Sequence, residues 1–176
     1  MKKLSMMGAL LAFGLLAGCG GGGGGGGGSD TPAKSTGEVL TSVSASTLQI
    51  DRGTTVAGTD ANGDSVRDDV ATWIAAQGYT APMGSAVTQL AKAYQGALTV
   101  GVSDSDALRK ARTAASDAVE CVMQTAATID AGYKAVADLR RVAVNTDARV
   151  QAYLAYTAAV NDTVVRAPDG NGCASQ

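Results

Sequence analysis

The sequence predicts an all-α fold, a small bundle of about five helices that follows a signal peptide and a glycine-rich tether. Apolar residues recur at helical spacing in five consecutive segments after residue 65. Short connections separate these segments, as in a helix bundle. Aromatic residues make up only 4% of the chain and alanine is frequent, which favours closely packed helices. About 130 residues follow the tether, enough for one domain with a modest core.

The first two predicted helices have clear ends. The first stops at Gly78, because glycine is common just after a helix. The second starts near Pro82, which suits a first helical turn. Their apolar faces consist of Val66, Val70, Trp73, Ile74, Met83, Val87, Leu90, Tyr94, Ala97 and Leu98.

The last three predicted helices are marked less evenly. The third follows a capping signal, Ser103-x-x-Asp106. A turn at residues 144–147, with Asn145 or Thr146 as the cap, precedes the fifth. The break between the third and fourth helices, near residues 124–131, has no proline or glycine before Gly132. Their apolar faces consist of Leu108, Ala111, Ala115, Ala118, Val122 and Ala126, then Ile129, Tyr133, Val136, Leu139 and Ala143, then Val150, Tyr153, Leu154, Val160 and Val164.

The amino-terminal segment predicts export. Lys2 and Lys3 precede an apolar stretch, residues 4–17, that is too short for a permanent membrane helix. It ends in Leu16-Ala17-Gly18-Cys19, which resembles the lipobox of bacterial lipoproteins. The resemblance implies a signal peptide at residues 1–18, cleavage before Cys19, lipidation of its sulfur and attachment to a membrane. The alternative is an ordinary secretory peptide with an incidental cysteine.

The residues after Cys19 indicate where the domain is held. Gly20 replaces the Asp that marks retention in the inner membrane, so the analogy favours the outer membrane, with the domain in the periplasm or at the cell surface. Residues 19–47 form the lipidated cysteine and a linker with nine consecutive glycines, which behaves as a flexible coil. Residues 48–176 then form the helical domain, with an acidic loop at 60–71. The glycine tract lacks the following lysine and helix start of a phosphate-binding loop.

Composition excludes several classes of function. Removing residues 1–18 changes the formal charge from −2 to −4, so the mature chain offers no basic surface for nucleic acid. The chain has no histidine, which excludes Ser-His-Asp and Cys-His catalysis and histidine-ligated zinc.

Cys121 and Cys173 are an even pair in an oxidising compartment, and we expect a disulfide that fixes the polar tail to the helices. Two reduced thiols are the alternative.

The stretch TDANGDSVRDDV contains an alternating set of oxygen donors. Asp60, Asn62, Asp64, the carbonyl of Val66 and Asp68 occupy positions 1, 3, 5, 7 and 9 of a loop, the order in which EF-hand loops bind Ca²⁺. The stretch resembles the calcium loops of dockerins, thrombospondin type 3 repeats and EF-hands. We therefore predict Ca²⁺ at these five residues, with weak affinity.

Two departures from the calcium pattern leave an alternative open. Ser65 stands at position 6, where the turn favours glycine, and Ala71 stands at position 12, where an acid completes the site. In the alternative, Asp64 or Ser65 caps the helix and Ser65-x-x-Asp68 forms a capping box. That arrangement needs no ion.

A second resemblance covers most of the predicted domain. The segment NGxRDDV, residues 62–70 in part, is similar to uncharacterised secreted bacterial proteins. In those proteins an Asn-Thr-x-x-Arg pattern and an Ala-Tyr helix follow, and here Asn145, Thr146, Arg149, Ala152 and Tyr153 match. This resemblance implies no activity.

The sequence favours a non-catalytic, lipid-anchored envelope protein whose helical domain has a structural or interaction role with an unidentified envelope protein. One alternative is a hydrolase that uses paired carboxylates, which requires two acids in one cleft. The other is a small-ligand carrier, although the alanine-rich faces leave little room for an interior cavity.

Overall fold

A computed structural model describes residues 49–161, 163–164, 167–168 and 170–174. The predicted signal peptide, Cys19 and the whole predicted linker lie outside these residues, so those predictions stay predictions.

The described residues form five helices and no strand, which confirms the predicted all-α bundle. The helices are α2 (Asp68–Ala76), α3 (Ala81–Thr99), α4 (Ser105–Thr125), α5 (Ile129–Ala143) and α6 (Asp147–Val160). None of them is long and apolar enough to cross a bilayer.

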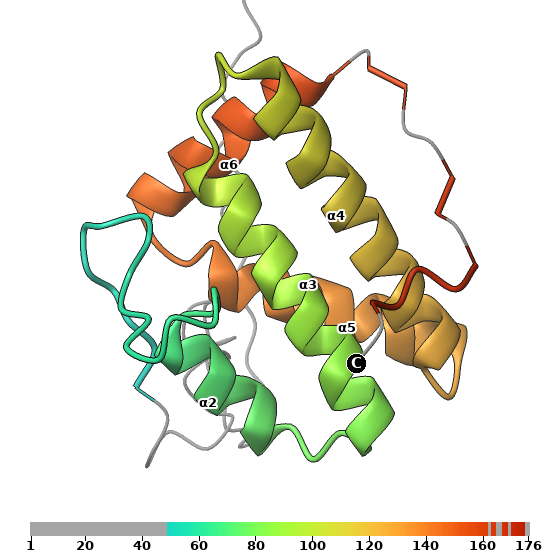
Figure 1. Ribbon diagram of the computed structural model, residues 1–176. Coiled ribbons are helices and arrows are strands. Elements are labelled where there is room, and N and C mark those ends of the chain that lie inside the picture. The colour runs from blue at the N-terminus through green and yellow to red at the C-terminus, as the bar shows by residue number, and fades with distance from the viewer. Residues whose placement is uncertain (1–48, 162, 165–166, 169, 175–176) are drawn as a thin grey trace, which may run out of the picture. The chain divides into compact units, whose positions relative to one another are not determined.

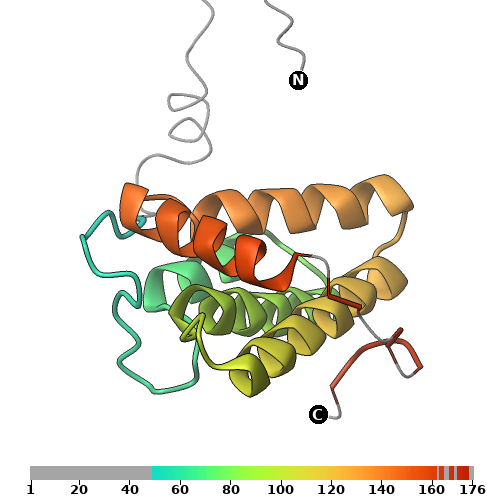
Figure 2. The ribbon, with the colours of Figure 1, turned by 90° about the horizontal axis from the view of Figure 1, so that it is seen from above.

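Helices α3 and α4 form the centre of the bundle. They lie side by side and run in opposite directions, with α5 and α6 behind them and α2 beside α3 (Figure 1). Figure 2 shows α5 and α6 on one side of this pair. The segment before α2 lies near the start of α6, so the first and last parts of the helical domain are in contact.

The helix ends follow local chemistry. Thr128 and Thr146 cap α5 and α6, and each hydroxyl accepts a bond from a backbone N–H three residues later. The sequence missed the Thr128 cap, because no glycine or proline marks it. Asp104, and not Ser103, caps α4, so the predicted capping box is wrong by one residue.

The core is made of aliphatic side chains between alanines. Val87, Leu90, Val122 and Leu139 have no exposed surface. Small buried residues of α3, α4 and α5 allow the helix axes to approach closely. These are Ala86, Ala91, Ala93, Ala97, Ala118, Gly132 and Ala135.

Parts of two predicted apolar faces are wrong. Ile129 and Tyr133 of α5 are 64% and 62% exposed, because the helix turns Gly132, Ala135 and Leu139 inward instead. On α6, Leu154 is 53% exposed. Val150 is also exposed, and the buried positions of α6 are Arg149 and Tyr156. Val164 lies beyond the end of α6 and is exposed.

Tyrosines join α6 to α3. The rings of Tyr94 and Tyr153 meet edge to face at 6.4 Å, and Tyr153 lies 6.5 Å from Tyr156. Burial, followed by the neighbouring Tyr153, raises the pKa of Tyr94 to about 12. The tyrosines therefore act in packing, and Tyr94 stays neutral at physiological pH.

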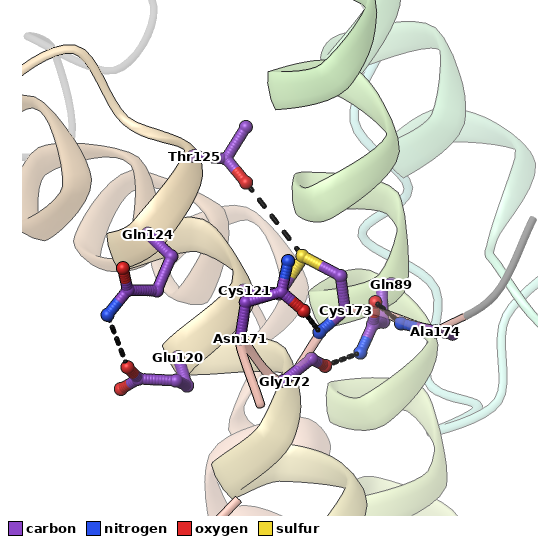
Figure 3. Close-up of a disulfide and its surroundings, with 9 residues drawn as sticks. All are labelled: Gln89, Glu120, Cys121, Gln124, Thr125, Asn171, Gly172, Cys173 and Ala174. Atoms are coloured by element: carbon purple, nitrogen blue, oxygen red, sulfur yellow. Dashed lines mark hydrogen bonds between the residues drawn. A yellow bond between two sulfur atoms is a disulfide. The ribbon is translucent and has the colours of Figure 1, made fainter. Parts of the chain in front are cut away.

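The carboxy-terminal tail is bonded to the helices at several points. Cys121 of α4 and Cys173 form a disulfide, as predicted, which closes a loop of 52 residues. The side-chain amide of Gln89 donates to the carbonyl of Gly172 at 2.8 Å and accepts from the N–H of Ala174 at 3.0 Å (Figure 3). A cross-link over such a loop stabilises a fold by about 2–4 kcal/mol.

Gly172 allows the tail to approach α4 closely. Its φ is +71°, and a Cβ atom there would lie 2.3 Å from the carbonyl oxygen of Asp117. Only glycine meets both conditions. The path of the tail is therefore set by this residue as well as by the disulfide.

Candidate functional site

The acidic loop folds onto its own backbone. The carboxylate of Asp60 accepts from the N–H groups of Asp64 and Ser65 at 3.1 and 2.9 Å. The side-chain oxygen of Asn62 accepts from the N–H of Asp64 at 3.1 Å, and Asp64 accepts from the N–H of Val66 at 2.8 Å. The first three predicted ligands are thus brought together.

The turn at position 6 has the backbone that the calcium pattern requires. Ser65 has φ +69°, the left-handed conformation that favours glycine. A non-glycine residue is strained there by about 1–3 kcal/mol, and it keeps this conformation only where its surroundings fix it. Here the bond from its N–H to Asp60 does so.

Helix α2 begins without a side-chain cap, so the capping alternative is wrong. The N-cap residue is Arg67, and no side chain bonds to the free N–H groups of the first turn as a cap. The oxygens of Asp64 accept instead from within the loop. The N–H of Asp68 donates to the carbonyl of Thr59 at 2.9 Å. Asp68 and Asp69 do occupy the first turn, where the helix dipole favours negative charge.

The remaining predicted ligands are less clearly arranged. The carboxylate of Asp68 turns toward the N–H of Ala61, at 3.2 and 3.3 Å. Val66 is buried, at 2% exposure. Within the described residues, no three Cys, Asp or Glu side chains gather closely enough to hold a metal ion by themselves. A calcium site here therefore also needs Asn62 and the backbone carbonyl of Val66.

Arg67 joins this loop to the end of α5. Its Nε and Nη2 donate to the two carboxylate oxygens of Asp69 at 2.9 and 2.7 Å. Its Nη1 donates to the carbonyl of Ala143 at 3.0 Å, and Nη2 also reaches Val142 at 3.3 Å. Arg67 is 1% exposed. Its guanidinium therefore satisfies carbonyls at the carboxy-terminal end of α5, where positive charge is favoured.

Arg149 holds the segment that precedes the loop. Its Nη2 donates to the carboxylate of Asp51 at 2.8 Å and to the carbonyl of Thr55 at 3.1 Å. Its Nη1 donates to the carbonyl of Asp51 and to Asn145, both at 2.8 Å, and its Nε donates to Val56 at 3.2 Å. Arg149 has no exposed surface.

The two arginines meet at Gly58. A Cβ atom at Gly58 would lie 2.5 Å from Cδ of Arg67 and 3.0 Å from Nη2 of Arg149, and its φ is +68°. The N–H of Asp51 donates to Asp69 at 2.9 Å, so the partners of the two arginines are also bonded to each other. We call Arg67, Arg149, Asp51 and Asp69 the arginine latch.

Both acids of the latch have lowered pKa values. Burial of Asp69 alone would raise its pKa, but the hydrogen bonds from Arg67 and the N–H of Asp51 outweigh burial and hold the pKa below its ordinary value. For Asp51, the bond from the N–H of Gly53 and then the bond from Arg149 lower the pKa. Both carboxylates are therefore charged at neutral pH.

The sequence alone does not indicate the latch. Arg67 and Arg149 stand out in it only within the resemblance to secreted bacterial proteins. A signal was present, because Arg149, Tyr153 and Tyr156 are spaced four and three residues apart, as on one helix face. An arginine in line with packed tyrosines indicates a buried, paired charge.

A surface groove lies between α2, α3, α4 and the tail. Its volume is about 760 Å³, and it is open to solvent. Ile74, Tyr79, Gln89 and Lys92 are among its lining residues, together with the disulfide. Asp and Glu are absent from its lining, within the described residues. Asp117 is among the residues that line a smaller hollow beside the tail.

No protein-family model, curated protein or solved structure matches this chain. The similarities to known calcium loops and to the lipobox therefore depend on the motifs alone.

We predict that Arg149→Ala lowers the free energy of unfolding by about 3–5 kcal/mol, because it leaves Asp51 and several carbonyls without their partner. Arg149→Lys should restore little of the loss, since an ammonium group cannot reproduce the fork of bonds. Chemical denaturation measures both values.

The matched control for the arginine change is Arg109→Ala. The pair of Arg109 with Asp106 is exposed, with side chains 68% and 78% accessible. Its removal should change stability by less than about 1 kcal/mol. Equal effects at the two arginines would contradict the account of the latch.

Acid should weaken the fold through Asp51 and Asp69. A carboxyl group whose pKa is lowered by folding stabilises above its unfolded value, near 3.9, and the stabilisation is lost as pH falls through the folded pKa. Urea unfolding should show constant stability from about pH 7 to 5 and a decline below. In Asp69→Asn, which is less stable at pH 7, the decline should be shallower. An equally steep decline in that variant would argue against the role of Asp69.

Proposed function

We propose that this chain is a lipid-anchored, non-catalytic protein of the cell envelope. Its helical domain has a structural or interaction role, and the acidic loop of that domain binds Ca²⁺ weakly. The loop supports the calcium part most, because Asp60, Asn62 and Asp64 gather around one turn. The anchor depends on Leu16-Ala17-Gly18-Cys19, which resembles a lipobox. The outer membrane is the destination that Gly20 favours.

The loop residues fit calcium chemistry in type. Asp60, Asn62, Asp64, the carbonyl of Val66 and Asp68 would hold the ion, which prefers several oxygen ligands. A carboxylate has about four lone-pair sites, so oxygens that accept one N–H bond can still bind a cation. The bound ion would neutralise the crowded carboxylates and so stabilise the loop. Asp69 is not a ligand in this proposal, since both its oxygens bond to Arg67.

The distribution of acids supports a non-catalytic role. A glycosidase-type mechanism requires two carboxyl groups facing one cleft. Among the residues that the structure describes, the lining of the groove between α2, α3 and α4 contains no carboxylate, and that of the smaller hollow contains one. The paired acids Asp51 and Asp69 are bonded to arginines.

The same groove favours a second candidate, a small-ligand carrier. Its volume of about 760 Å³ lies in the range of small-molecule sites, and apolar and polar side chains both line it. It lies on the surface and not in the bundle interior, so the sequence-based objection to an interior cavity does not apply to it. Because the groove is open to solvent, a ligand in it would lie along the surface and would not be enclosed by the protein.

Calcium should raise the stability of the purified protein. For a dissociation constant of about 0.1–1 mM, 10 mM CaCl₂ adds about 1.4–2.7 kcal/mol to the free energy of unfolding, and EDTA removes the gain. Asp60→Asn should reduce this response strongly. Asp106→Asn, an exposed acid outside the loop, should keep it. An unchanged melting temperature with no calcium heat in calorimetry would exclude the calcium part.

Lipidation should require Cys19. In cells supplied with labelled palmitate, the unaltered chain and Cys173→Ser should carry the label, because Cys173 is far from the lipobox in sequence. Cys19→Ser should lose the label and move to the soluble fraction. Label retained in Cys19→Ser would contradict the anchor.

A further inference from the structure

Side chains of the helices hold residues 51–57 mainly through hydrogen bonds to the main chain of this segment. Four main-chain carbonyls of this segment accept from side chains of the helical part. Arg149 donates to Asp51, Thr55 and Val56, Asn145 donates to Asp51, and Gln95 donates to Ala57 at 2.8 Å. One side chain of the segment is also recognised, the carboxylate of Asp51.

Little apolar surface secures this segment. Residues 52–55 and 57 are exposed, Asp51 and Val56 are half-buried, and Ile50, just before the segment, packs against the core. In contrast, Arg149 is fully buried, so the donor side of the contact is part of the folded core. The site belongs to the helices, and the segment is the exposed component bound to it.

The chain on the carboxy-terminal side of the segment allows it to move away as a unit. Gly58 lies against both arginines and has a positive φ, and residues 61–65 are exposed. Among the described residues, the hydrogen bonds of the chain between Gly58 and Val66 lie within the loop or reach the start of α2.

We propose that the Arg149 site also takes this segment in trans, from a second copy of the chain. The contacts are to main-chain carbonyls and to one aspartate, so the same segment of another copy makes identical bonds. Exchange of this segment keeps the contacts described above and needs the loop at residues 59–65 to open. The partner is a second copy because the aspartate and the carbonyls four to six residues after it must match the site.

The contacts at Arg149 do not require calcium or the lipid anchor, although calcium bound in the loop at residues 59–65 would oppose its opening. Two copies held near each other would raise the effective concentration of the segment and favour exchange.

The test opens the site in one chain and supplies the segment separately. In the full chain with Asp51→Arg, like charge beside Arg149 releases the chain's own segment. The probe is a fluorescent peptide of residues 49–58, and anisotropy measures its binding. We expect the peptide to bind this variant at least tenfold more tightly than the unaltered chain, and Asp51→Asn in the peptide to weaken binding at least tenfold.

Two controls define the result. The full chain with Asp106→Arg changes an exposed acid by the same charge and should bind no more peptide than the unaltered chain. Circular dichroism confirms that the Asp51→Arg chain remains helical. A helical Asp51→Arg chain that ignores the peptide, or binds both peptides equally, overturns the proposal.

A second measurement serves if Asp51→Arg does not fold. Populations of the unaltered chain with light and heavy isotopes are concentrated together, and native mass spectrometry records mixed dimers. We expect mixed dimers that disappear with excess peptide of residues 49–58. Monomers alone at every concentration, or dimers unaffected by the peptide, overturn the proposal.

Discussion

Two guanidinium groups inside a small helical bundle constrain the rest of this molecule. Removing a charge from water costs several kcal/mol, and hydrogen bonds to all sides of the group must offset that cost. Arg67 and Arg149 are 1% and 0% exposed, and each meets a carboxylate and main-chain carbonyls. These acceptors come from both ends of the domain. The segment before α2, the end of α5 and the start of α6 must therefore fold together.

The latch also explains the position of the acidic loop. Arg67 is the last residue before α2, so its burial fixes where the loop ends, and Gly58 between the arginines fixes where it begins. The loop must close over a short distance, and its own oxygens satisfy the backbone of the turn. A cation would act on a loop whose ends are already held. At the other end of α2, the disulfide and Gln89 hold the tail beside the groove.

The sequence predicts the helices well because their apolar period is local information. It predicts the Cys121–Cys173 pair because only two cysteines remain once Cys19 is assigned to lipid. It fails at α6, where Leu154 looks like core but is exposed, because an arginine occupies the inward position. The roles of Arg67 and Arg149 depend on carbonyls more than seventy residues away, which no local pattern encodes. The capping interpretation failed for a related reason, since the loop uses its oxygens internally.

Native-state hydrogen exchange at two backbone N–H groups tests the latch most directly. The N–H of Asp51 donates to Asp69, and that of Asp68 donates to Thr59, so both are protected only while the segment stays bound. The account predicts that both groups exchange slowly, through openings that cost several kcal/mol, although Asp51 lies outside any helix. Exchange of both at the rate of a free peptide, with the helix α3 groups still protected, would contradict it.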